Sequence, residues 1–354
     1  MSDVDPASEP PADLIATLRA EHATWEDNVV DRAVFGTDDP AQIAALLSDF
    51  CASHLGSPVA AARFYKVSVA CVAGLDLADG RAVVVKAQQG GRREGYLTAC
   101  FAFRRLLVSE GFPCPRPLGA PTRVGPAWLT AEERMTSGSP GDAHDPAIRR
   151  AIAESLARLV SIGERFEEAE SFGRAWFSGL PEGRVFPRPH SPFFDFEKTR
   201  DGAEWIEALA GEARARRLAA AGPRVIGHFD YRVEHLRFDG DRVVASFDWD
   251  SLHHEHLPVL LGSLAPHFTA DWQRDAIVRA PSMDEMRAFV ADFEAARGQP
   301  FTGAERSTLS AALVYAMAYT ARCNHASSPR EEGWNGDLRP TLREHARAIL
   351  DAGL

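Results

Sequence analysis

Five aspartates lie in one short stretch, residues 227–250, which reads GHFDYRVEHLRFDGDRVVASFDWD. Asp230 stands in a His-x-Asp frame, and Asp248 and Asp250 stand in a Phe-Asp-Trp-Asp frame. Two carboxylates that lie close together repel each other at neutral pH unless a proton or a cation sits between them. Mg²⁺ is the simplest cation for such a place, because it takes hard oxygen ligands and phosphate oxygens can complete its octahedron. The pattern therefore indicates metal-assisted phosphate chemistry.

A predicted hairpin brings two of these aspartates together. The dipeptide Asp-Gly at residues 239–240 favours a tight turn and lies between two β-rich runs, HLRF and RVVASFDW. With a two-residue turn, Phe238 pairs with Asp241, and the same register places Asp248 one residue from the position opposite Asp230. We therefore expect both carboxylates at the same end of one ladder.

Asp-rich turns are often solvated surface, so one His-x-Asp or one Asp-Gly hairpin is weak evidence for a site. Asp248 differs, because the residues around it in VVASFDWD are apolar and a carboxylate in such a strand is costly without a partner. We therefore expect Asp230 and Asp248 to be functional, whereas Asp250 fits a functional or a solvated role equally well.

A lysine far upstream is the second chemical signal. Only three of the 39 basic residues are lysines, Lys66, Lys86 and Lys198. Lys86 ends the β-branched run AVVVK, where a compact ammonium could reach phosphate oxygens as a point charge. The alternative is an edge lysine whose ammonium extends to solvent.

The elements that must position these residues fall into two regions. Residues 64–87 contain two β-rich runs joined through Asp-Gly, and a helix is predicted over 92–111, with further strands at 115–120 and 126–135. A connector, TSGSPGDAHDP at 136–146, follows. Beyond it the sequence is mainly helical, and the periodic stretches lie near 146–164, 201–221, 283–297, 303–323 and 339–352. The aromatic and proline-rich segment 166–196 is predicted to be a loop over a pocket.

Composition narrows the class of protein. A chain of 354 residues with 45% hydrophobic content can bury a large core in two domains or two lobes. The net charge of -11 argues against nucleic-acid binding and favours, weakly, a cationic small molecule. The start of the chain, MSDVDPASEPPADL, is not that of a secretion signal, and no run of apolar residues is long enough for a membrane span. The five scattered cysteines are typical of reduced thiols, so we expect a cytoplasmic protein: Cys51, Cys71, Cys100, Cys114 and Cys323.

The strand lysine, the connector, the His-x-Asp frame and the hairpin ending in Phe-Asp-Trp-Asp together resemble the aminoglycoside phosphotransferase and choline kinase-like family. The resemblance covers the chain from about residue 30 to its end. It implies an α+β, protein kinase-like bilobal fold with a small β-rich N-terminal lobe and a larger, mainly helical C-terminal lobe. We accordingly expect a helical extension over 1–54, a nucleotide-binding lobe over 55–135 and a catalytic and substrate-binding lobe over 136–354.

The same resemblance implies an activity and roles for single residues. The chain would move the γ-phosphate of ATP or GTP to a hydroxyl of a small acceptor, such as an aminoglycoside or another amine-bearing compound, with Mg²⁺. Lys86 would bind the α and β phosphates, and Glu94 would pair with it, with Glu110 as the alternative partner. Asp230 would be the catalytic base or orient the hydroxyl, and Asp248 would bind the metal.

Two positions depart from the family pattern. Phe229 replaces a glycine of the usual His-Gly-Asp, and His235 stands where a metal-binding asparagine is expected. Imidazole is a poorer Mg²⁺ ligand than oxygen, so either His235 binds metal, or one metal is held strongly, or the protein is weak or inactive. We expect activity because Lys86, Asp230 and Asp248 are all present; a non-catalytic nucleotide-binding protein is the alternative.

A further enzyme hypothesis comes from HHEH at residues 253–256. These side chains could form a metal cluster with Asp248 and Asp250, as in a metal-dependent phosphoesterase. Adjacent histidines lack the i,i+4 spacing that places two ligands on one helix face, so we expect a solvated loop here instead.

Overall fold

The computed structural model describes residues 10–89, 94–189, 191, 194–217 and 219–354. The chain divides into two compact units, one of Met1–Ser109 with Cys114–Thr136 and one of Glu110–Pro113 with Ser137–Leu354. Some predicted elements extend past the described residues. The following residues of predicted elements lie outside the described ones: 1–9 of the N-terminal extension, 92–93 of the helix predicted over 92–111, 218 of the helix predicted over 201–221, and 190 and 192–193 of the aromatic loop.

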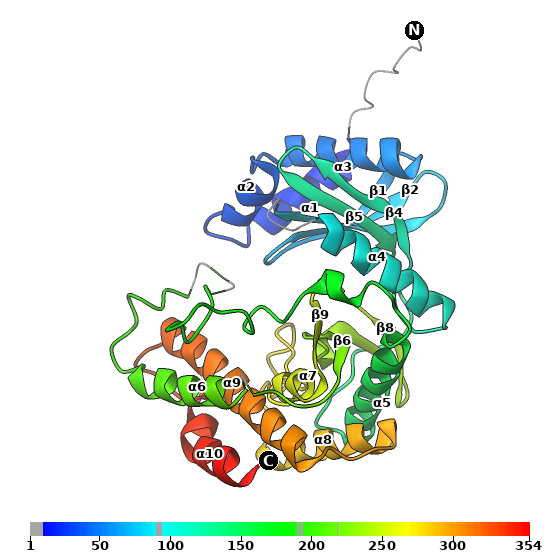
Figure 1. The fold of residues 1–354 in the computed structure, drawn as a ribbon. Helices are drawn as coiled ribbons and strands as arrows, with labels where there is room; N and C mark the ends of the chain where they lie inside the picture. The colour runs from blue at the N-terminus through cyan, green and yellow to red at the C-terminus, as the bar shows by residue number, and fades with distance from the viewer. Residues whose placement is uncertain (1–9, 90–93, 190, 192–193, 218) are drawn as a thin grey trace. The chain divides into compact units, whose positions relative to one another are not determined.

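The first unit contains a five-stranded antiparallel sheet in the order β1-β2-β3-β5-β4 (Figure 1). Its helices are α1 (Ala12–His22), α2 (Val29–Phe35), α3 (Pro40–Leu55) and α4 (Glu94–Ser109). Its strands are β1 (Val59–Val67), β2 (Cys71–Leu77), β3 (Ala82–Gln89), β4 (Pro117–Val124) and β5 (Ala127–Glu133).

The N-terminal helices share one core with this sheet. Leu14 and Leu18 of α1 and Ile43 of α3 are fully buried with Leu75 and Val83 of the strands. Burial of such side chains is the main favourable term in folding, so α1 and α3 are built into the same hydrophobic core as the sheet.

The strand predictions for this unit are confirmed except at one turn. The predicted run from residue 64 to the Asp-Gly turn contains parts of two strands, β1 and β2, which are joined at Ser68–Ala70. That turn contains no Gly, Pro, Asn or Asp, and its single turn-favouring residue, Ser68, is a weak signal. The Asp-Gly turn is present, with Gly80 at a φ of 86° between β2 and β3.

The second unit is mainly helical and carries two small antiparallel ladders, β6 with β9 and β7 with β8 (Figure 1). Its helices are α5 (Pro146–Gly163), α6 (Glu204–Arg217), α7 (Leu257–Leu264), α8 (Met283–Arg297), α9 (Gly303–Ser327) and α10 (Arg339–Ala352). Its strands and short 3-10 turns are η1 (Ala169–Phe172), β6 (Arg224–His228), η2 (Val233–His235), β7 (Leu236–Asp239), β8 (Arg242–Ser246) and β9 (Leu252–His256).

The five predicted helices of this unit are confirmed, because their local signals are strong. Ser282 and Glu285 form a reciprocal capping box at the start of α8, and Gly298 ends that helix in the left-handed region. Thr302 and Glu305 form a second capping box at α9. Each box satisfies backbone N–H groups that a helix start otherwise leaves unpaired. The long helix α9 packs against α6, α7 and α10 and forms the centre of the unit.

The prediction of a solvated loop at residues 253–256 is wrong. These residues form β9, which pairs along its whole length with β6. Glu255 is fully buried there, and Nε of Arg174 donates to its Oε1 at 2.8 Å. The strand is stabilised by its ladder and by this ion pair, and neither is visible in the local sequence, which has no apolar alternation.

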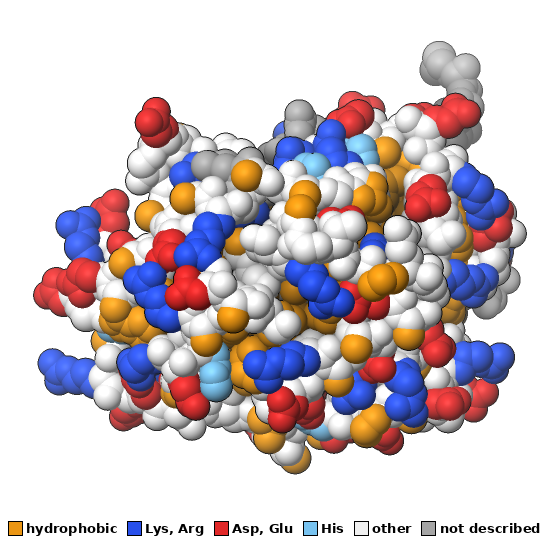
Figure 2. All heavy atoms as spheres, turned by 60° about the horizontal axis from the view of Figure 1, so that its bottom comes forward, with side chains coloured by type: hydrophobic (Ala, Val, Ile, Leu, Met, Phe, Trp, Pro, Cys, Tyr) orange, Lys and Arg blue, Asp and Glu red, His pale blue; other side chains and the backbone are white. Residues whose placement is uncertain are grey.

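No helix in the described part of the chain is long and apolar enough to cross a membrane. Acidic and basic side chains are interspersed, not separated by sign, over the face shown in Figure 2. Ion pairs of the second unit show the same mixing, for example Arg343 with Glu332 at 2.8 Å and Arg306 with Glu294 at 2.7 Å.

One partly exposed pair joins the connector to the start of α8 and should make stability depend on pH. Nδ1 of His144 lies 2.6 Å from Glu285, and Nε2 lies 2.7 Å from the carbonyl of Val278. Burial lowers the pKa of His144, but these two acceptors outweigh it and raise the pKa above the ordinary 6.5. Burial raises the pKa of Glu285, but hydrogen bonds from Ser282 and His144 hold it below the ordinary 4.5.

We expect the His144→Gln variant to lose about 1 kcal/mol of unfolding free energy near pH 5.5 and much less near pH 8.5. The histidine contributes stability below its unfolded pKa and loses it as pH rises through the folded pKa. The glutamate contributes above its unfolded pKa and loses it as pH falls through the folded one. The pair is therefore strongest between these two ordinary values. Urea unfolding at both pH values measures the effect, and an equal loss at both would contradict it.

Candidate active site

Two ladders position the loops that carry the predicted aspartates. The β6–β9 ladder ends where His228 lies opposite Leu252, and the N–H of Phe229 then donates to Ser251. Asp230 follows immediately. Asp248 lies shortly before β9, the second strand of this ladder. The pairing of β6 with β9 therefore sets the separation between the Asp230 loop and the Asp248 loop.

The β7–β8 hairpin closes the same loops from the other side. Its ladder ends at Leu236 opposite Ser246, and beyond it the N–H of Phe247 donates to the carbonyl of His235 at 2.9 Å. Phe247 directly precedes Asp248, so this bond places His235 beside Asp248.

The predicted register of this hairpin is wrong. Phe238 was expected opposite Asp241, but Asp239 lies opposite Arg242, and an irregularity between Arg237 and Phe238 shifts the pairs that follow. The turn residues are Gly240 and Asp241, with Gly240 at a φ of 61°. The aspartates still converge, because the β6–β9 ladder and the hairpin together determine their positions.

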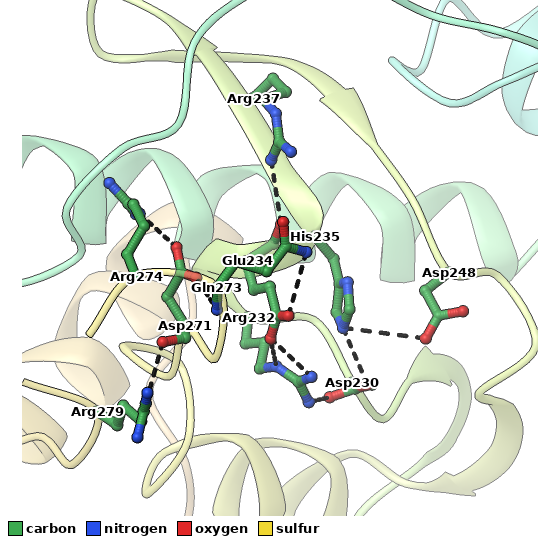
Figure 3. A network of polar contacts seen from close by, with 10 residues as sticks. All are labelled: Asp230, Arg232, Glu234, His235, Arg237, Asp248, Asp271, Gln273, Arg274 and Arg279. Atoms are coloured by element: carbon green, nitrogen blue, oxygen red, sulfur yellow. Dashed lines mark hydrogen bonds and ion pairs between the residues drawn. The ribbon is translucent and has the colours of Figure 1, made fainter. Parts of the chain in front are cut away.

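Asp230, His235 and Asp248 form a group with metal-ligand spacing. One ligand atom from each lies within 4.8 Å of the others (Figure 3). Nε2 of His235 lies 3.1 Å from Oδ2 of Asp230 and 3.9 Å from Oδ2 of Asp248. All three side chains are partly exposed, so a ligand can reach them. Two carboxylates and an imidazole are a donor set that fits a divalent cation.

Asp248 has an unusual backbone conformation. Its φ is 62°, and among the described residues it is the non-glycine residue with a positive φ. This left-handed conformation costs a non-glycine residue about 1–2 kcal/mol, although aspartate tolerates it better than most. Such strain is held in place by the surrounding structure and is concentrated at functional sites.

His228 connects the two aspartate loops through both nitrogens of its ring. It is fully buried, its Nδ1 accepts from the N–H of Asp230 at 3.1 Å, and its Nε2 lies 3.2 Å from the carbonyl of Phe247. Because a backbone N–H can only donate and a carbonyl can only accept, the ring is neutral with its proton on Nε2. Burial lowers the pKa of His228, in agreement with this form. Sequence reasoning used His228 only as part of a motif and missed this positioning role.

Arg232 is the residue of the site that sequence reasoning missed entirely. Its Nη1 pairs with Oδ1 of Asp230, and its Nε donates to Glu234 at 3.0 Å (Figure 3). Burial raises the pKa of Asp230, but the charge of Arg232 and the hydrogen bond from His235 outweigh burial and hold this pKa below its ordinary value. Asp230 is therefore ionised at neutral pH and can accept a hydrogen bond from a hydroxyl. An arginine two residues after the aspartate was the available signal.

A wider polar network holds the partner of Arg232. Glu234 accepts from the side chain of Gln273 at 3.4 Å, and its backbone carbonyl accepts from Arg237 at 3.1 Å. Next to Gln273, Asp271 and Arg274 pair at 2.5 Å (Figure 3). These contacts restrict the rotation of Arg232 and, through it, of Asp230.

Lys86, which is predicted to bind phosphate, and Glu94, which is predicted to pair with it, lie in the first unit. Lys86 is on the central strand β3, half-buried, between Val72 of β2 and Thr130 of β5. Glu94 is exposed in the first turn of α4. Glu110, the alternative partner for Lys86, pairs instead with Arg165 at 2.8 Å. The joint action of Lys86 and Glu94 stays a prediction.

The histidines of β9 are directed to different partners. The ring of His253 packs against Phe229, Nδ1 of His254 lies 3.2 Å from Glu170, and Nδ1 of His256 lies 2.7 Å from the carbonyl of Gly222. In the described residues, the group with metal-ligand spacing contains none of them. The phosphoesterase hypothesis therefore gains no support from this strand.

Comparison with known proteins gives a family and a fold. Residues 75–309 match the model of the phosphotransferase enzyme family. No curated protein matches the chain by sequence. Amicoumacin kinase hAmiN, in complex with AMP-PNP, Ca²⁺ and Ami, is similar in structure with a TM-score of 0.58 and 11% identity, over 82% of this chain and 88% of that one.

A thermostable mutant of aminoglycoside phosphotransferase APH(4)-Ia, in a ternary complex with ADP and hygromycin B, is also similar. Its TM-score is 0.51 at 14% identity, over 87% of this chain and 99% of that one. At these identities the similarity shows the fold alone. The expected α+β, kinase-like fold, with a β-rich N-terminal part and a helical C-terminal part, is confirmed.

Proposed function

Because this chain belongs to the phosphotransferase enzyme family, we propose that it transfers the γ-phosphate of ATP or GTP to a hydroxyl of a small-molecule acceptor. The observation that carries the proposal is the convergence of Asp230, His235 and Asp248 within 4.8 Å. Phosphoryl transfer requires alignment and charge neutralisation more than covalent help, and this group can provide both.

The residues divide the work as follows. Asp230, held by Arg232 and His235, accepts the hydrogen of the acceptor hydroxyl and points its oxygen at the phosphorus. Asp248 and His235 would hold Mg²⁺, which would neutralise charge on the phosphates. In that state Nε2 of His235 would give its lone pair to the ion instead of donating a proton to Asp230. In the β-rich lobe, expected over 55–135, Lys86 binds the α and β phosphates and Glu94 orients it. The helical lobe, expected over 136–354, binds the acceptor.

The solved complexes and the composition suggest the ligands. The similar structures contain AMP-PNP in one case and ADP with hygromycin B in the other, which supports ATP as the donor and an antibiotic-like acceptor. The net charge of -11 favours an amine-bearing acceptor. All five cysteines are buried free thiols, which supports a cytoplasmic location.

One observation favours a second candidate, a non-catalytic nucleotide-binding protein. Both oxygens of Asp230 are already engaged, Oδ1 by Arg232 and Oδ2 by His235. An acceptor hydroxyl must therefore share an oxygen with one of them. Nucleotide binding without turnover over a broad panel of hydroxyl compounds would identify this candidate.

The experiment that tests the proposal is a transfer assay with labelled ATP and GTP over cationic hydroxyl compounds, run on wild type and on the Asp248→Asn variant. We expect Asp248→Asn to bind the metal–nucleotide complex about 10- to 100-fold more weakly, because it loses an anionic ligand. Calorimetry with Mg²⁺ and AMP-PNP measures this affinity. Asp241→Asn, at an exposed turn position, is the matched control. Equal affinity in all three proteins would contradict the assigned metal site.

A further inference from the structure

The donor atoms at the metal-ligand group include a nitrogen. Nε2 of His235 lies 3.9 Å from Oδ2 of Asp248 and 3.1 Å from Oδ2 of Asp230. We propose that His235 makes this site selective for Mn²⁺ over Mg²⁺. The inference rests on the proposed metal-dependent function and specifies which ion the site prefers.

The two ions differ in what they accept as ligands. Mg²⁺ demands near-ideal octahedral geometry, loses water reluctantly and is held in proteins by oxygen. Imidazole nitrogen is a ligand for transition metals, and carboxylate suits both Mg²⁺ and Mn²⁺. The imidazole of His235 together with the carboxylate of Asp248 therefore suits Mn²⁺ and leaves Mg²⁺ with one poor ligand.

The spacing of the atoms permits one ion to reach both predicted ligands. An ion with bonds of about 2.1 Å can bridge two atoms up to about 4.2 Å apart. The separation of 3.9 Å between His235 and Asp248 lies below this limit.

The charge around the group also suits a divalent ion. Asp230, Glu234 and Asp248 are carboxylates, and Arg232 binds the first two. Metal binding requires Nε2 of His235 to be unprotonated, so the ion would replace the hydrogen bond from this nitrogen to Asp230. The cluster then keeps an excess of negative charge. Arg232 occupies Oδ1 of Asp230, so the other oxygen, Oδ2, is the one that faces His235. The guanidinium therefore approaches the group from the side away from the imidazole.

The opposing reading gives His235 a simpler role, in which it only donates a hydrogen bond to Asp230. In that case the ion would contact Asp248 without His235, and replacing the imidazole would not alter the choice between Mn²⁺ and Mg²⁺. The two readings thus differ in metal preference and in whether a nitrogen nucleus is bound to the ion.

Electron paramagnetic resonance of Mn²⁺ tests the inference, with Mn²⁺ alone and with Mn²⁺ and AMP-PNP, followed by displacement with Mg²⁺. The proteins are wild type, His235→Asn, His235→Ala and the control His345→Asn, which removes an imidazole from the surface of α10. We expect His235→Asn to reduce the preference for Mn²⁺ over Mg²⁺ by at least about tenfold. We expect His345→Asn to match wild type.

A second measurement does not depend on the folding of any variant. Pulsed resonance of Mn²⁺ on the wild-type protein should detect the nitrogen nucleus of a coordinated imidazole. A wild-type spectrum without this coupling, an absence of Mn²⁺ binding, or a preference unchanged in His235→Asn would each overturn the inference. If the protein transfers phosphate and His235→Asn has the same metal preference as wild type, this inference alone is overturned. Mn²⁺ bound through His235 in a protein without transfer would overturn only the proposed function.

Discussion

Replacement of Asp230 by asparagine is expected to lower the turnover number of phosphate transfer by about 10³-fold. The amide cannot take up the hydroxyl proton, and it does not offer the anionic oxygen that now faces His235. Arg232 keeps its second carboxylate partner, Glu234, so no guanidinium is left buried without a counter-charge. The expected change is therefore in turnover, with a small effect on stability.

Three measurements separate this effect from simpler ones. The turnover number should fall, the Michaelis constant for nucleotide should change little, and the unfolding transition should stay close to that of wild type. Asp241→Asn makes the same chemical change at the exposed turn of the hairpin and should be as active as wild type. Wild-type turnover in Asp230→Asn would remove Asp230 from the mechanism.

The buried pair of Asp337 and Arg339 should have the largest effect on stability. Both side chains are fully buried, and Nε of Arg339 donates to Oδ1 of Asp337 at 2.9 Å. The guanidinium also donates to the carbonyl of Ser328 at 2.8 Å, while Asp337 accepts from the N–H of Gly333 at 2.8 Å. Two side chains thus satisfy several backbone groups of the loop between α9 and α10.

We expect Arg339→Leu to lower the unfolding free energy by about 3–5 kcal/mol, because it leaves the Asp337 carboxylate buried without its cation. Burial raises the pKa of Asp337, and the hydrogen bonds from Arg339 and the backbone now hold this pKa below its ordinary value. Without Arg339 the carboxylate must take up a proton or remain as an uncompensated charge.

Urea unfolding followed by tryptophan fluorescence measures the loss. The control is Glu332→Gln, which breaks the exposed pair between Glu332 of the same loop and Arg343 of α10. This change should lower the unfolding free energy by at most about 1 kcal/mol. The double variant Asp337→Asn with Arg339→Leu should lose less than the sum of its single changes, since the double variant leaves no buried charge without a partner. A loss in Arg339→Leu no larger than that in the control would show that the pair contributes little.

Local signals let the sequence determine most helices and the identity of the central residues. The capping boxes at Ser282 and Thr302 and the periodic apolar faces of α5, α8 and α10 act over one or two turns, so a short window contains them. Asp230 and Asp248 could be singled out in the same way, because a carboxylate in an apolar run is costly wherever the run packs. These features depend on neighbours in the chain.

Only the tertiary structure determines the features that depend on contacts between residues distant in sequence. The strand β9 forms because it pairs with β6. The register of the β7–β8 hairpin is shifted by an irregularity that no residue type in the sequence predicts. The contact of the His228 ring with the carbonyl of Phe247 likewise follows from the packing of two ladders. A buried backbone group or a buried charge needs a hydrogen-bonding or ionic partner, because water no longer reaches it. In this protein those partners are brought together only by the completed fold.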